Sequence, residues 1–380
     1  MRKVCVITGS RAEYGLLSSL MQKIKDSDDL VLQVIATNMH LSPEFGLTYR
    51  EIEKDGFTID KKVEMLLSSD TANATAKSVG LGTIGFADAY SDLSPDIIVV
   101  LGDRYEILAA VSAALFYQIP VAHLHGGEIT EGAYDDPIRH AITKMSHLHF
   151  TSTEEYRKRV IQLGESPDRV FNVGAIGLDN IKTCKFLSKE ELEKSLGFEL
   201  GEKSLLVTYH PVTLENDTAR QQCNNLLNVL DRHPEYRIVF ILPNSDTGGR
   251  AIIDCIQNFV SRNKNRAVSF SSLGKIRYLS ALNYISAVIG NSSSGILEVP
   301  SFGIPTLDIG DRQKGRISAA SVVHCGTTME DINMGFNRLF SEEIMLVAKD
   351  RKNPYEKRGT VESIIKVLKS YPLEGILHKP

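Results

Sequence analysis

The sequence is poor in cysteine, and its few cysteines suit neither a disulfide framework nor a zinc ribbon. They are odd in number, lie far apart and form no C-x-x-C pair. A scattered set of this kind favours small buried side chains over cross-links or metal ligands. The five are Cys5, Cys184, Cys223, Cys255 and Cys325.

Long apolar runs are also lacking. No run approaches the roughly 18 residues that a membrane-spanning helix requires. The first apolar run, residues 4–7, is too short for the apolar core of a signal peptide, and it ends at Thr8-Gly9-Ser10. We therefore expect a cytoplasmic protein that has no membrane partner.

Neither sign of charge dominates the composition. The 43 lysines and arginines and the 47 aspartates and glutamates give a net charge of -4. A general nucleic-acid-binding protein would carry a strongly basic domain, so we expect no nucleic-acid partner. The balance still permits a local basic pocket for one anionic ligand. Hydrophobic residues at 42% and charged residues at 24% are ordinary for a soluble globular protein.

Short apolar runs alternate with helical stretches along the chain. Several runs lack polar alternation, as strands buried on both faces of a parallel sheet do. After the first run, Leu16, Leu17, Leu20, Met21 and Ile24 form one apolar helix face. This alternation predicts an α/β protein. The expected strands are residues 4–7, 31–37, 97–101, 121–124, 148–151, 170–173, 205–208, 237–242, 268–270, 287–289 and 306–309.

The 380 residues suggest two or three domains at about 150 residues each. The strand pattern breaks after residues 174–177, and a polar helical stretch follows in which Ser188 and Glu191 fit a capping box. We expect two doubly wound domains facing a central cleft, residues 1–177 and 178–356. The last segment, residues 357–380, is expected to be a helix that packs back on the first domain.

In open parallel sheets, ligands bind at the carboxyl ends of the strands. T-G-S-R-A-E-Y-G, residues 8–15, follows the first strand; its small residues allow a tight turn, and the next helix offers N–H groups to an anion. Arg11 adds a charged contact. The alternative is a plain strand-to-helix turn. After residues 97–101, Asp103 either caps the next helix or presents a carboxylate to the cleft with Arg104 beside it.

The segment from His123 to His140 is the densest in reactive side chains. It contains H-x-H-G-G-E at 123–128 and D-D-P-I-R-H at 135–140, and five of the ten histidines lie between residues 123 and 149. A metal site and a polar loop with Asp135 or Asp136 capping a helix are both open alternatives. Paired carboxylates and imidazoles at a strand end favour acid–base chemistry.

Four polar segments in the second half suit a nucleotide. Consecutive hydroxyl and N–H groups in G-N-S-S-S-G, residues 290–295, open a helix and can bind a diphosphate. Glu298 then accepts hydrogen bonds from a ribose diol, or simply complements the helix dipole. The other segments are residues 209–213, 242–246 and 310–316.

These motifs, in this order and with G-D-R-Q-K-G-R at 310–316, resemble the hydrolysing UDP-N-acetylglucosamine 2-epimerases, which make the N-acetylmannosamine of sialic acid synthesis. The resemblance extends from Thr8 to beyond Arg316. More distantly, the chain is similar to the non-hydrolysing 2-epimerases of cell-envelope synthesis. The resemblance implies a GT-B-like fold of two Rossmann-like domains with the nucleotide sugar between them.

The resemblance also implies roles for individual residues. Asp103 and Asp135 match catalytic carboxylates. Relatives carry H-x-E where this chain has His125, so either His125 or Glu128 is expected to take over that proton transfer. The residues implied to bind UDP are Arg11, Arg104, His210, Asn244, Ser292, Ser293, Gly295, Glu298 and Arg312.

The implied reaction removes the C2 proton as UDP leaves C1, and water then adds to the unsaturated acetamidoglucal. Neither step transfers a hydride, so no nicotinamide cofactor is needed, and nothing demands a metal. The alternatives are the same reaction on a UDP-2,4-diacetamido-2,4,6-trideoxyhexose of the legionaminic acid pathway, a GT-B glycosyltransferase, and a nucleotide-sugar-binding regulator. A homo-oligomer, a dimer or a tetramer, is also expected.

Overall fold

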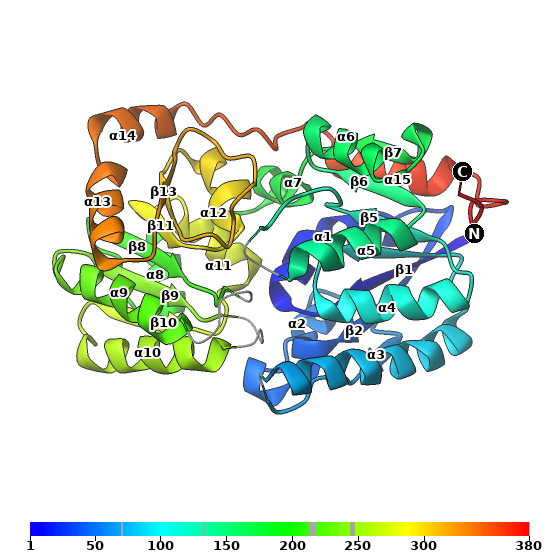
Figure 1. Ribbon diagram of the computed structural model, residues 1–380, viewed down its shortest axis with the longest axis horizontal. Helices are drawn as coiled ribbons and strands as arrows, with labels where there is room; N and C mark the ends of the chain where they lie inside the picture. The colour runs from blue at the N-terminus through cyan, green and yellow to red at the C-terminus, as the bar shows by residue number, and fades with distance from the viewer. Residues whose placement is uncertain (70, 132–133, 213–217, 244–247, 380) are drawn as a thin grey trace. The chain divides into compact units, whose positions relative to one another are not determined.

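The computed structural model describes residues 1–69, 71–131, 134–212, 218–243 and 248–379. The chain divides into two compact units, each built on one parallel sheet (Figure 1). Unit 1 comprises Met1–Glu128, Asp135–Lys182 and Tyr355–Pro380, and unit 2 comprises Ile129–Tyr134 and Thr183–Pro354. The predicted α/β class with two parallel sheets is confirmed.

The sheet of unit 1 has seven strands in the order β3-β2-β1-β4-β5-β6-β7. The strands are β1 (Arg2–Thr8), β2 (Leu30–Thr37), β3 (Lys61–Val63), β4 (Ile97–Leu101), β5 (Val121–Leu124), β6 (Leu148–Thr151) and β7 (Val170–Asn172). The helices are α1 (Arg11–Lys25), α2 (Tyr49–Lys54), α3 (Ala72–Leu93), α4 (Tyr105–Phe116), α5 (Asp135–Met145), α6 (Glu154–Gln162), α7 (Ile176–Thr183) and α15 (Thr360–Ser370).

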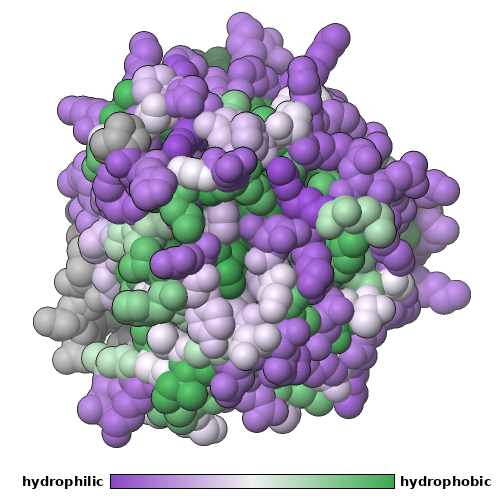
Figure 2. Space-filling view, turned by 90° about the vertical axis from the view of Figure 1, so that its right-hand side faces the viewer, coloured by the Kyte–Doolittle hydropathy of each residue, from purple (hydrophilic) through white to green (hydrophobic). Residues whose placement is uncertain are grey.

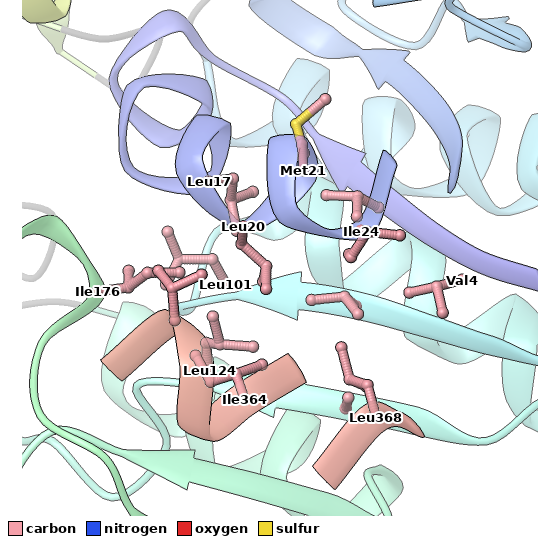
Figure 3. Packing of buried hydrophobic residues seen from close by; sticks show 14 of the residues in the cluster. Val4, Leu17, Leu20, Met21, Ile24, Leu101, Leu124, Ile176, Ile364 and Leu368 are labelled. Atoms are coloured by element: carbon pink, nitrogen blue, oxygen red, sulfur yellow. The ribbon is translucent and has the colours of Figure 1, made fainter. Parts of the chain in front are cut away.

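Helices cover both faces of this sheet because successive strand residues point to opposite sides. Val4 and Val6 of β1 pack with α1 and α15, whereas Cys5 and Ile7 pack with α3 and α4. Figure 3 shows the first of these cores, in which side chains of α1 and α15 meet those of β1, β4 and β5. Of the apolar helix face predicted from Leu16 to Ile24, Leu16 is partly buried there and the other four residues are fully buried.

The sheet of unit 2 has six strands in the order β10-β9-β8-β11-β12-β13. The strands are β8 (Ser204–Thr208), β9 (Arg237–Ile241), β10 (Ala267–Phe270), β11 (Ala287–Gly290), β12 (Thr306–Ile309) and β13 (Val322–Cys325). The helices are α8 (Lys189–Leu196), α9 (Ala219–Asp231), α10 (Gly249–Arg262), α11 (Gly274–Ala281), α12 (Ser294–Leu297), α13 (Met329–Leu339) and α14 (Glu342–Lys349). The capping box of Ser188 and Glu191 is confirmed at the start of α8.

All eleven expected strands are present, and two edge strands were not predicted. β3 is three residues long with two lysines, and β13 carries an exposed histidine, so neither has an apolar run that stands out. Among the described residues, no helix is both long enough and apolar enough to cross a bilayer. The face drawn in Figure 2 is mostly hydrophilic, with hydrophobic groups between the hydrophilic ones.

The C-terminal tail of unit 1 is attached to the sheet through a buried carboxylate. Glu165, 4% exposed, accepts hydrogen bonds from Lys379 at 2.7 Å and Lys144 at 2.6 Å. Its other neighbour is His149 of β6, 3.1 Å away. Burial alone would raise the pKa of Glu165, but these hydrogen bonds outweigh burial and lower the pKa to about 2.

We expect Glu165→Gln to lower the free energy of unfolding at pH 7 by roughly 1–3 kcal/mol, the cost of losing charged hydrogen bonds. Because the folded pKa of Glu165 is depressed, its contribution is complete above the unfolded value of about 4.3. The difference in free energy of unfolding between parent and variant should therefore decrease as the pH falls from 5 toward 3. Urea titrations at several pH values measure it.

The matched control is Glu362→Gln, which removes an exposed carboxylate 3.8 Å from Lys23. Surface pairs of this kind contribute about 0–1 kcal/mol, so this variant should unfold like the parent. A Glu165→Gln gap that stays constant with pH would show that the loss comes from packing and not from the charge.

Candidate active site

The site in unit 1 lies where the strand order reverses. β1 and β4 are neighbours in the sheet, yet their following helices α1 and α4 pack on opposite faces. Such a switch point leaves the carboxyl ends of the two strands open to a ligand. Gly9, after β1, has no room for a side chain, because a Cβ there would collide with the Glu106 carboxylate.

Two buried carboxylates, those of Glu13 and Glu106, lie beside this turn. Glu13 accepts a hydrogen bond from the Gly9 N–H at 2.6 Å, and its N–H is capped by Ser10 at 3.4 Å. Burial, followed by the nearby charge of Glu106, raises the pKa of Glu13 to about 8. The residues of the T-G-S-R-A-E segment therefore form an ordered turn with an unusually basic carboxylate inside it.

Two predicted UDP-binding arginines are held at this edge of unit 1. Arg11, the first residue of α1, has its Nε 2.5 Å from a Glu51 carboxylate oxygen. Arg104 donates from Nε to Glu106 at 2.7 Å. Both guanidinium groups are thus oriented by carboxylates of their own unit.

Asp103 pairs with Arg139, a residue of α5. The N-cap of α4 is Arg104, which makes no side-chain capping bond, so the capping alternative for Asp103 is wrong. Arg139 is only 1% exposed, and its Nη1 also donates to the Glu128 carbonyl at 2.6 Å. Nη1 lies 3.5 Å from Asp136 as well. A buried guanidinium that keeps its charge thus brings carboxylates from two separate segments together.

His125 and Glu128 form a buried pair just after β5. The His125 Nδ1 is 2.9 Å from Glu128 Oε1, and Ser152 donates to the same oxygen at 2.8 Å. His125 has a φ of 65°, in the left-handed region. Gly127 has a φ of 81°, and a Cβ there would lie 2.5 Å from the Tyr156 carbonyl oxygen. The turn therefore depends on a glycine and on bonds from neighbouring segments.

All four predicted catalytic residues lie in unit 1. Arg139 contacts Asp103 and the Glu128 carbonyl, and the Glu128 side chain pairs with His125. Asp135 is the half-buried first residue of the helix that carries Arg139. The imidazoles of H-x-H have different partners, because His123 contacts the Gly102 carbonyl at 2.8 Å while His125 contacts Glu128.

In unit 2, Asn291 ties together the segments expected to bind the nucleotide. Its side-chain oxygen accepts the His210 N–H at 2.7 Å, and its amide donates to the His210 carbonyl at 2.8 Å. Its own carbonyl accepts from Arg312 at 3.3 Å and from Gln313 at 2.8 Å. The preceding Gly290, at φ 138°, has no room for a Cβ beside the Thr208 carbonyl.

The serine-rich segment starts a helix of one turn. Ser293 is the N-cap of α12, and the Ser292 and Ser294 hydroxyls are 3.2 Å apart. Glu298 directly follows this single turn, as its C-cap. Burial raises the pKa of Glu298 to about 7. Asn244, also predicted to bind UDP, lies outside the described residues.

Comparison with known proteins identifies the family. Residues 22–369 match the family model described as UDP-N-acetylglucosamine 2-epimerase. The chain belongs to this family. It is 45% identical over 379 residues to the Campylobacter jejuni protein named GDP/UDP-N,N'-diacetylbacillosamine 2-epimerase (hydrolyzing), covering 100% of this chain and 98% of the relative.

Two further likenesses agree with this family. A Legionella pneumophila relative, named UDP-N,N'-diacetylbacillosamine 2-epimerase (hydrolyzing), is 34% identical over 380 residues, 100% of this chain and 99% of its own. The crystal structure of the Neisseria meningitidis UDP-GlcNAc 2-epimerase bound to UDP-GlcNAc has a TM-score of 0.82 at 18% identity, covering 96% of this chain and 99% of that chain. At that identity the likeness shows the fold, which is GT-B-like.

Sequence reasoning missed several residues that hold the two sites. Arg139 lies in D-D-P-I-R-H, and its spacing of three from Asp136 puts both on one helix face, but the motif alone assigns it no role. Asn291 lies in G-N-S-S-S-G, which likewise assigns it no role. Ser152 lies in none of the motifs, and Gln313 lies in G-D-R-Q-K-G-R without a predicted role, because their partners Glu128 and Asn291 are distant along the chain.

We expect Asn291→Ala to lower the free energy of unfolding of unit 2 by roughly 2–4 kcal/mol, because it removes both hydrogen bonds between Asn291 and the main chain of the buried His210. Asn258→Ala, on the exposed side of α10, is the control and should stay within about 0.5 kcal/mol of the parent. Chemical denaturation measures both. Equal stability of parent and Asn291→Ala would mean that the His210 segment is held by other contacts.

Proposed function

We propose that the protein is a hydrolysing 2-epimerase that converts a UDP-linked 2-acetamido sugar into UDP and the free C2-epimer. The observation that carries the proposal is the buried Arg139, which orients Asp103 after β4 and Asp136 in the first turn of α5. Carboxylates fixed in this way are suited to move a proton to or from a sugar carbon.

In the proposed reaction, a base of unit 1 removes the C2 proton, and the C1–O bond to UDP breaks. The electron pair of the C2–H bond forms the C1–C2 double bond of an acetamidoglucal, and the bond pair to UDP leaves with the diphosphate. Water then adds its oxygen to C1, and a proton returns to the opposite face of C2. The sum consumes one water and needs no oxidant or reductant.

Stabilising the departing diphosphate is the larger electrostatic task. The α12 segment supports this role, since Ser292, Ser293 and Ser294 gather hydroxyl groups around its start. Arg312 lies on the neighbouring segment, held to the Asn291 carbonyl. We assign Glu298 to the ribose, where its carboxylate accepts hydrogen bonds from the diol.

For the sugar, we favour a 2,4-diacetamido-2,4,6-trideoxyhexose over N-acetylglucosamine. The support is the name of the 45% identical Campylobacter jejuni relative together with that of the Legionella pneumophila relative. The N-acetylglucosamine reaction, which yields N-acetylmannosamine, is the second candidate and is favoured by the description of the family model. A glycosyltransferase would need an acceptor site, whereas the carboxylates around Arg139 suit proton transfer.

We expect the purified protein to release UDP and a free sugar from UDP-N,N'-diacetylbacillosamine without added NAD. Product formed in heavy water should carry deuterium at C2, because elimination exchanges that proton with solvent. Parallel assays with UDP-N-acetylglucosamine and with the GDP-linked diacetamido sugar measure the preference for sugar and base. Product without deuterium would rule out elimination, and transfer to an added acceptor sugar would favour the glycosyltransferase.

Ser293→Ala and Glu298→Ala should each weaken UDP binding by roughly 1–3 kcal/mol, the cost of losing a hydrogen bond to a charged or buried group. Titration calorimetry with UDP alone measures this. Ser261→Ala and Glu330→Ala, both at exposed positions of unit 2, are the matched controls. Unchanged affinity for UDP in both test variants would show that the α12 segment only forms the helix after β11 and does not contact the nucleotide.

A further inference from the structure

The imidazole of His125 has a defined tautomer. The backbone N–H of Ile176, the first residue of α7, donates to His125 Nε2 at 3.3 Å. A nitrogen that accepts an N–H bond carries no proton of its own, so the proton of the neutral ring is on Nδ1. Nδ1 is the nitrogen 2.9 Å from Glu128, and it therefore donates to that carboxylate.

Both members of this pair are enclosed. The side chains of His125 and Glu128 are 9% and 2% exposed, whereas that of Asp103 is 20% exposed. Both ring nitrogens of His125 are engaged within unit 1, and Glu128 accepts from His125 and Ser152 together. A proton-transferring group must meet its substrate at hydrogen-bond distance, and of these three residues Asp103 is the most accessible.

The main chain of the same turn connects this pair to Asp103. The Glu128 carbonyl accepts from Arg139 Nη1, and Arg139 Nη2 pairs with Asp103. One residue earlier, the Gly127 carbonyl accepts from Arg159 at 2.6 Å. The His125 N–H donates to the Phe150 carbonyl at 2.8 Å. Any change in the conformation of residues 125–128 therefore moves the acceptor that holds Arg139.

We propose that His125 and Glu128 are positioning residues, which lock the turn after β5 so that its carbonyl holds Arg139 against Asp103. On this assignment neither residue takes over the role of the glutamate that the family resemblance implies at the position of His125, and proton transfer belongs to the carboxylates that Arg139 orients. The assignment rests on the proposed function only in that Asp103 is taken as the catalytic carboxylate.

The tautomer is tested by nitrogen NMR of the full chain with labelled histidine. His125 should show a protonated Nδ1 and an unprotonated Nε2, and the signal is identified by its loss in His125→Asn. His123 is a control of the opposite kind, because its Nε2 faces the Gly102 carbonyl and must carry the proton. A protonated Nε2 on His125 would overturn the proposal whether or not the protein turns over any UDP-sugar.

The roles are separated by the pH profiles of kcat and KM, measured with the sugar nucleotide that the parent hydrolyses. Asp103→Asn should lower kcat by roughly 100-fold or more, as for loss of a general acid or base. Glu128→Gln keeps an acceptor for His125, and His125→Asn keeps a donor and tolerates positive φ. Both should lose less than about 10-fold in kcat and keep both limbs of the pH profile.

His125→Ala removes the donor altogether and is expected to lose more in kcat than His125→Asn, with KM close to that of the parent. His125→Ala should also shift the acidic limb of the pH profile of kcat. That limb reports the ionisation of a carboxylate, and in this variant Arg139 no longer orients the carboxylate as it does in the parent. A 100-fold loss together with a missing limb in Glu128→Gln or His125→Asn would make that residue the proton carrier instead. A parent without turnover on any UDP-sugar would refute the proposed function, while the NMR result would still decide the tautomer.

Discussion

The charge of Arg139 is the constraint on which the site of unit 1 depends. Its guanidinium keeps its proton at any physiological pH and is 1% exposed, so leaving it without partners would cost several kcal/mol. Among the described residues, its partners lie at the end of β4, in the turn after β5 and in the first turn of α5. Satisfying one buried cation therefore fixes the relative positions of three segments that the sequence separates.

In unit 2 a neutral side chain, that of Asn291, holds separate segments together. The Asn291 amide has a donor and an acceptor, which match the carbonyl and N–H of His210, and this pairing holds main chain to main chain. Arg312 and Gln313 use the Asn291 carbonyl in turn. The two units thus differ in what they fix. Unit 1 orients charged side chains, whereas unit 2 orders the backbone around its short serine-rich helix.

The sequence predicted the strands well because a parallel sheet buried on both faces needs continuous apolar runs. It missed β3 and β13 because edge strands are short and partly exposed. For the site, the motifs placed Asp103, His125 and Glu128 near one another, since the ends of neighbouring parallel strands meet at one edge. They gave no role to Arg139, because its partners come together only through three-dimensional packing.

A motif specifies which residue type stands at a position, but not which atom of it carries a proton. H-x-H-G-G-E offers two imidazoles and a carboxylate, and on residue type alone each is a plausible base. Their roles diverge because His123 faces a carbonyl and His125 faces a helix N–H, which require opposite tautomers. Only the tautomer of His125, with its proton on Nδ1, places a donor beside Glu128. The backbone around the turn, with its positive φ at His125 and Gly127, therefore determines the chemistry of the side chains that it presents.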